Sequence, residues 1–108
     1  MKKYFLLSIL AFSVFTGCAH HYYRAKGGAV ELYLKRPDAI AVAFASSLDG
    51  YQLHRAEKRD SSTWKVTVPG YREFTYFYIV DGVLFLPSCK FKEKDDFGAV
   101  NCIYIPGL

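Results

Sequence analysis

The stretch from residue 73 to residue 86, EFTYFYIVDGVLFL, limits the fold more than any other part of the chain. Phe74, Tyr76, Tyr78 and Val80 recur at every second position, which is the period of a β-strand with one face on a core. Asp81-Gly82 interrupts the run, and this dipeptide is typical of a two-residue hairpin turn. The sequence therefore predicts an antiparallel hairpin with strands over 73–80 and 83–86.

The same two-residue period recurs on both sides of this hairpin. It predicts strands over 29–35, 39–45, 63–68 and 99–105, a weaker strand over 52–58, and a charged loop over 90–96. No window of eleven or more residues after the N-terminal segment has a helical period. About seven short strands predict an all-β fold, an antiparallel immunoglobulin-like sandwich. The side chains expected to face its core include Val30, Leu32, Leu34, Ile40, Val42, Phe44, Leu53, Ala56, Trp64, Val66 and Val68, with Glu31, Tyr33 and Lys35 on the opposite face.

The N-terminus has the order of an export signal. Lys2 and Lys3 precede an apolar run over 4–15, which is shorter than the roughly 20 residues of a membrane-spanning helix. Phe15-Thr16-Gly17-Cys18 then resembles a bacterial lipobox, which implies that Cys18 is acylated with fatty chains such as palmitate. We expect a lipoprotein signal peptide over 1–17, the lipidated cysteine and a tether over 18–28, and one domain over 29–108. The alternatives are an ordinary signal peptide and a buried N-terminal helix.

A lipid-anchored chain is expected in the cell envelope. Several acyl chains on one cysteine hold a protein durably at a membrane, whereas one chain does so only marginally. The residue after Cys18 is Ala19 and not an aspartate, which favours the outer membrane in an organism that has two membranes. Membrane lipid is therefore the first expected partner.

The charge does not indicate a nucleic-acid partner. The chain has 14 Lys and Arg residues against 10 Asp and Glu residues. Two of the lysines precede the expected cleavage point, so the mature chain keeps 12 basic residues against the same 10 acidic ones. No dense basic stripe remains, and nucleic-acid binding is not expected.

Two cysteines, Cys89 and Cys102, remain once Cys18 is assigned to lipid. An even pair in an exported domain predicts a disulfide, and the alternative is two reduced, buried thiols. The histidines do not form a metal-ligand pattern, because His20 and His21 are adjacent in the expected tether and His54 stands apart. We expect no metal and no cofactor.

From Asp38 onward, the order of features resembles the glycogen-binding domain of AMP-activated protein kinase. Related early-set domains stand beside the catalytic domains of isoamylases and glycogen-branching enzymes. The resemblance covers roughly seventy residues and implies an early-set sandwich that holds α-glucan on one face. The matching stretches are Ala39–Tyr51, Trp64–Pro69, Phe74–Gly82 (FTYFYIVDG), Pro87 and Gly98–Ile105 (GAVNCIYI).

The resemblance also implies five candidate binding residues. Tyr51 stands where the family has a loop tryptophan, and Asn101 keeps an amide that bonds a sugar hydroxyl. Phe97 replaces a leucine, while Leu84 and Phe77 replace a second tryptophan and a basic residue. The stacking positions are thus partly kept, and the polar positions are mostly changed.

Two functions follow from these residues. The first is a non-catalytic module that binds α-glucan or another glycan, and the second is an interaction module for an envelope protein. Both would use the strand face that carries Thr75, Phe77 and Ile79, where a sandwich strand is normally polar. We expect no enzymatic activity, because no nucleophile with a base and no pair of acids has a catalytic spacing.

Overall fold

The computed structural model describes residues 21–108, so the expected signal peptide and Cys18 lie outside the described residues. The described chain forms ten strands and one 3-10 turn, η1. Their bounds are β1 His21–Lys26, β2 Ala29–Lys35, β3 Val42–Ser46, η1 Ser47–Asp49, β4 His54–Arg55, β5 Glu57–Lys58, β6 Thr63–Pro69, β7 Phe74–Val80, β8 Val83–Phe85, β9 Lys92–Lys94 and β10 Val100–Tyr104.

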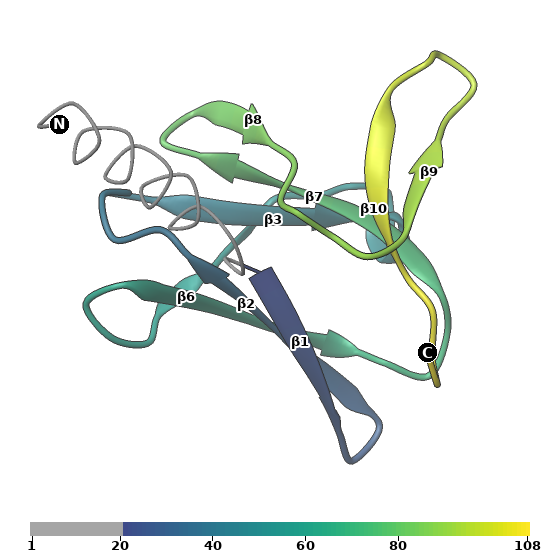
Figure 1. Cartoon of the computed structure of the whole chain (residues 1–108), viewed down its shortest axis with the longest axis horizontal. Helices are drawn as coiled ribbons and strands as arrows, with labels where there is room; N and C mark the ends of the chain where they lie inside the picture. Colours follow the sequence, from purple (N-terminus) through teal and green to yellow (C-terminus); the bar gives the residue numbers. More distant parts are fainter. Residues whose placement is uncertain (1–20) are drawn as a thin grey trace, which may run out of the picture.

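The strands form two sheets that pack face to face (Figure 1). The four-stranded sheet has the order β1-β2-β6-β5, and the six-stranded sheet has the order β4-β3-β7-β10-β9, with β8 also paired to β7. Every strand pair is antiparallel. The predicted antiparallel β-sandwich is confirmed, with ten strands in place of about seven because several edge strands have only two or three residues.

The hairpin predicted over residues 73–86 is confirmed in detail. β7 alternates between buried and half-buried residues along its whole length. β8 pairs with it in the register Val80↔Val83, Ile79↔Leu84. Asp81 and Gly82 have φ values of 50° and 83°. Both turn positions therefore have the positive φ that a tight hairpin turn requires.

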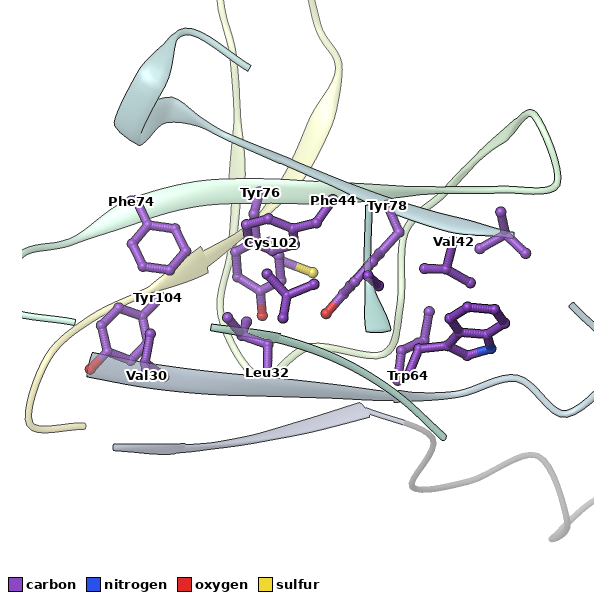
Figure 2. Packing of buried hydrophobic residues seen from close by; sticks show 14 of the residues in the cluster. Val30, Leu32, Val42, Phe44, Trp64, Phe74, Tyr76, Tyr78, Cys102 and Tyr104 are labelled. Atoms are coloured by element: carbon purple, nitrogen blue, oxygen red, sulfur yellow. The ribbon is translucent and has the colours of Figure 1, made fainter. Parts of the chain in front are cut away.

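The core lies between the two sheets (Figure 2). Phe44, Phe74, Tyr76 and Tyr78 of the six-stranded sheet face the aliphatic residues of β2. The rest of the described core includes Val30, Leu32, Leu34, Val42, Trp64, Val66, Val80, Cys102 and Tyr104. Residues 21–108 thus contain every described strand and the whole described core.

The domain begins earlier than the sequence indicates. Residues 21–26, expected as part of the tether, form β1, which pairs with β2 from His21↔Leu34 to Lys26↔Ala29. The sequence did not predict this strand because HYYRAK has polar residues on both faces and therefore no alternation of apolar and polar residues. His21 and Tyr23 nevertheless face inward: His21 contacts Tyr76, and the ring of Tyr23 lies edge-on to Tyr104.

The predicted strand over 39–45 begins later, at Val42, and Ile40 is 87% exposed, so its predicted place in the core is wrong. The cause lies in the hairpin turn. The Asp81 carboxylate accepts hydrogen bonds from the backbone N–H groups of Ile40 and Ala41, both at 2.8 Å. These two donors are therefore used by a side chain and not by a neighbouring strand.

The predicted strand over 52–58 is in fact a crossing between the sheets. β4 pairs with β3 in the six-stranded sheet, and β5 pairs with β6 in the four-stranded sheet. Only Ala56 separates them; it is buried, and its N–H donates to the Val42 carbonyl at 2.8 Å. Leu53, expected to face the core, is 60% exposed because it precedes this crossing.

The predicted disulfide in the C-terminal region is confirmed, whereas the predicted loop between its two cysteines contains a strand. Cys89 and Cys102 are bonded, with their Cα atoms 5.8 Å apart. The stretch over 90–96, expected as a loop, contains β9, which pairs with β10 in the register Val100↔Lys94 to Cys102↔Lys92. All three β9 residues are charged and exposed, so the sequence has no alternation of apolar and polar residues there that would predict a strand.

Substitution of Tyr78 by phenylalanine is expected to stabilise the domain. The Tyr78 hydroxyl is buried and has no hydrogen-bond partner in the described part of the chain. A buried polar group without a partner costs about 1–3 kcal/mol. We expect Tyr78→Phe to raise the free energy of unfolding by about 1 kcal/mol in urea titrations. An unchanged or lower value would contradict this expectation, and Tyr76→Phe, which removes a bonded hydroxyl, serves as the control.

Candidate functional site

The outer surface of the six-stranded sheet brings together most of the predicted binding residues. Phe77 and Ile79 of β7 point away from the core, and Leu84 of β8 lies opposite Ile79. On the other side of β7, Ala45 lies opposite Phe77. We call this surface the aromatic face and define it by Tyr51, Thr75, Phe77, Ile79, Leu84 and Asn101.

The centre of the aromatic face is a pair of nearly parallel rings. The Tyr51 and Phe77 ring centroids are 5.8 Å apart, with 15° between the ring planes. The Tyr51 hydroxyl is hydrogen-bonded to the Thr75 hydroxyl, and the Tyr51 N–H donates to the Ser46 carbonyl at 2.8 Å. These contacts hold a ring that is still 40% exposed.

Tyr51 has an unusual backbone conformation. Its φ is 66°, and it follows Gly50, whose φ is 75°. A non-glycine residue in this left-handed region costs about 1–3 kcal/mol, and such residues concentrate at functional sites. The loop Ser47–Tyr51 therefore keeps a costly conformation that sets the Tyr51 ring beside Phe77.

An apolar hollow of about 320 Å³ lies on the same sheet, and neither ring of the pair lines it. Its lining includes Ala43, Leu53, Arg55 and Ile79. Leu84, which lies opposite Ile79, is 60% exposed at the margin of the same face. The face thus offers a flat aromatic pair, an apolar hollow and one cation.

Of the remaining two predicted residues, Asn101 lies on the aromatic face and Phe97 does not. Asn101 precedes the inward-facing Cys102 on β10 and therefore faces the side of Phe77. Phe97 lies at the tip of the β9–β10 hairpin, which projects from the sheet (Figure 1), and is 96% exposed. The Asp95 carboxylate accepts from the N–H groups of Phe97 and Ala99, both at 2.9 Å. These two hydrogen bonds close the backbone turn, and Phe97 is not part of the aromatic face.

A groove of mixed polar and apolar lining, which the sequence does not reveal, lies between β4 and β6 of the two sheets. It has a volume of about 670 Å³. His54, which stands apart in the sequence, bonds through Nε2 to the Asp49 carboxylate, and this bond lowers the pKa of Asp49. The only sequence signal is the short spacing of these two residues across the Gly50 turn. Lys65 and Glu57 also line the groove, and within residues 21–108 no cluster of three or more His, Cys, Asp or Glu side chains could hold a metal.

A second cluster lies on the outer surface of the four-stranded sheet. The Tyr33 hydroxyl donates to Glu31 at 2.9 Å and accepts from Arg24 and Arg59 at 3.1 and 2.9 Å. The Tyr22 ring stacks on Tyr33 with a centroid distance of 4.8 Å. Tyr33 is therefore buried although it faces away from the core. The hydrogen bonds from Tyr33 and Arg24 lower the pKa of Glu31 to about 2.

The comparisons with known proteins leave the family of the chain open. No protein-family model matches the sequence, and no curated protein matches it. Among residues 21–108 there is no helix of the length and apolarity needed to cross a bilayer.

Proposed function

We propose that the protein is a non-catalytic, lipid-anchored protein of the cell envelope that binds a glycan on its aromatic face. Acylation of Cys18 provides the membrane anchor, and an α-glucan is the first glycan to test because of the resemblance to glycogen-binding domains. The observation that carries the proposal is Tyr51, whose strained backbone holds an exposed ring parallel to Phe77.

The chemistry of this face suits the apolar side of a sugar ring. Pyranose rings present a flat surface of C–H groups, and aromatic side chains offer a large, rigid contact surface at low conformational cost. Phe77 and Tyr51 supply two such rings, and Asn101 supplies an amide with both donor and acceptor atoms. Arg55, at the edge of the apolar hollow, supplies a further set of donors.

A second candidate is the binding of an envelope protein through the same face. Leu53 and Leu84 favour it, because both are 60% exposed beside Ile79 and carry no hydrogen-bonding group for a sugar. Exposed apolar side chains gathered at one place are typical of protein-interaction surfaces.

Removal of the Tyr51 ring is expected to abolish glycan binding. Residues 19–108 are run by affinity electrophoresis in gels that contain glycogen, amylopectin, β-cyclodextrin or peptidoglycan. We expect retardation by at least one glycan, and a loss of affinity of about tenfold or more in Tyr51→Ala, because a central aromatic anchor carries a large part of a binding energy. Asn101→Ala is expected to weaken the same binding.

Tyr22→Ala is the matched control, because Tyr22 is an exposed tyrosine on the opposite sheet. It should leave the retardation unchanged. Absence of retardation by all four glycans, together with Phe77-dependent co-purification of an envelope protein, would replace the first function by the second. Thermal melts of each variant establish that the fold is intact.

A further inference from the structure

The outer surface of the four-stranded sheet has more cationic than anionic side chains, five against three. We call it the basic face. Its residues alternate with the inward-facing residues of the same strands, such as His21, Tyr23, Leu34 and Trp64. The carboxylates near it are Glu31, Glu57 and, in the adjoining turn, Asp60. Its cations are Arg24, Lys26, Lys35, Arg59 and Lys65.

The Glu31 carboxylate on the basic face is paired with two cations of the same face. One Glu31 oxygen accepts from Arg24 at 3.2 Å, and the other lies 3.4 Å from the Lys65 ammonium. Asp60 accepts from the backbone N–H groups of Ser62 and Thr63. Arg59 makes no ion pair with any residue of 21–108, and its guanidinium lies over the Tyr33 ring, 5.3 Å from the centroid. The face thus has cationic charge to spare for an external anion.

An exposed aromatic side chain accompanies these cations. Tyr22 is 54% exposed and stacks on Tyr33. Tyr22, Arg24 and Arg59 line a hollow of about 450 Å³. Tyrosine is enriched where proteins meet lipid headgroups, and arginine and lysine are attracted to anionic lipids. The combination therefore fits a phospholipid surface.

The chain length places this face near the expected anchor. Only Ala19 and His20 separate Cys18 from His21, the first residue of β1. Three peptide steps span at most about 11 Å, so an acylated Cys18 brings the start of β1 within that distance of the bilayer. Tyr22 and Lys35 lie at this end of the sheet, because His21 pairs with Leu34. This step rests on the proposed lipid anchor, whereas the charge argument does not.

We propose that the basic face docks on an anionic phospholipid surface through Tyr22, Arg24 and Arg59. The aromatic face belongs to the other sheet of the sandwich (Figure 1) and is then turned away from the lipid. Lipid phosphates and the exposed guanidinium groups form charge-assisted hydrogen bonds, for which the planar donor fork of arginine is well suited.

Vesicle sedimentation of residues 19–108 tests the docking without the acyl chains. Vesicles of phosphatidylcholine alone are compared with vesicles that also contain phosphatidylglycerol, at low and high salt. We expect binding to the anionic vesicles only, with a loss at high salt because charge attraction is screened. The double variant Arg24→Gln, Arg59→Gln is expected to bind at least about tenfold more weakly.

The matched control is Lys92→Gln, Lys94→Gln, which removes the same charge from β9 at the edge of the other sheet. It should bind like the unmodified domain. Equal binding to both vesicle types, or equal losses in the two double variants, would overturn the proposal. Thermal melts of both variants separate a local effect from unfolding.

Two further measurements keep this proposal distinct from the proposed function. Incorporation of labelled palmitate by the full chain, and its loss in Cys18→Ser, tests the anchor alone. Glycan retardation of the Arg24→Gln, Arg59→Gln domain tests the aromatic face alone and should be unchanged. A chain that is acylated and binds glycan, but whose unacylated domain ignores anionic vesicles, would disprove only the docking.

Discussion

Residues 19–108 are expected to lose about 3 kcal/mol of stability when the pH falls from 6.5 to 4. The cause is His21 of β1, which is half-buried against β2 and β7. Nδ1 donates to the Tyr33 carbonyl at 2.9 Å, and the neutral Nε2 accepts from the Tyr76 hydroxyl at 2.8 Å. Burial lowers the pKa of His21 from 6.5 to about 4.

The direction of the effect follows from that shift. Between pH 6.5 and 4 the unfolded chain binds a proton at His21 that the folded chain does not bind, so acid favours unfolding. The contribution of neutral His21 to the free energy of unfolding is fully present above pH 6.5. It is lost as the pH falls toward about 4, the pKa of His21 in the folded chain. Urea unfolding at a series of pH values measures it.

A variant of His21 isolates its contribution. His21→Gln should flatten the dependence of the free energy of unfolding on pH in this window. Glu31, whose pKa is lowered to about 2, contributes only at lower pH, because its stabilisation is lost as the pH falls from 4.5 to about 2. A flat profile in the unmodified domain would disprove the assignment.

Removal of the disulfide is expected to have an effect of similar size. Cys102 is fully buried in the core, and its bond to Cys89 closes a loop with a sequence separation of 13. A loop of this length restricts the unfolded chain by about 3 kcal/mol. We therefore expect Cys89→Ala, Cys102→Ala to lower the melting temperature by about 10 °C or more.

Reductant provides the internal control for this prediction. It should lower the stability of the unmodified domain to that of the double variant and should leave the double variant unchanged. β9 is expected to separate from β10 first, because its three paired residues are all exposed. Equal melting temperatures with and without reductant would contradict the prediction.

The fold was predictable wherever one strand face meets the core and the other meets solvent. β7 meets this condition, and its alternation gave the correct register and hairpin. Ile40 did not follow the pattern, because a distant carboxylate, Asp81, captures its N–H and that of Ala41. Tyr33 faces outward as expected, but the Tyr22 ring covers it. Tyr22 belongs to β1, which the sequence pattern did not predict. Both departures depend on contacts between residues that are distant in sequence.

The candidate site was predictable in part. Phe77 and Leu84 share a face because the period of two and the Asp-Gly turn fix their positions. The contact of Tyr51 with Phe77 depends on the positive φ of Tyr51, which no sequence pattern indicates. The resemblance groups Phe97 with them, but β10 pairs with β7 only over Cys102–Tyr104, so the hairpin that carries Phe97 extends beyond the end of β7.

The short β5 leaves part of a strand edge uncovered. β5 pairs only with Trp64 and Lys65, so β6 continues beyond it to Pro69. An uncovered strand edge is a template for another copy of the same chain, and the risk of aggregation rises when many copies share one surface. Pro69, at the end of this uncovered stretch, lacks an N–H and cannot donate to an incoming strand. The proline thus limits the pairing of this edge with another copy of the chain.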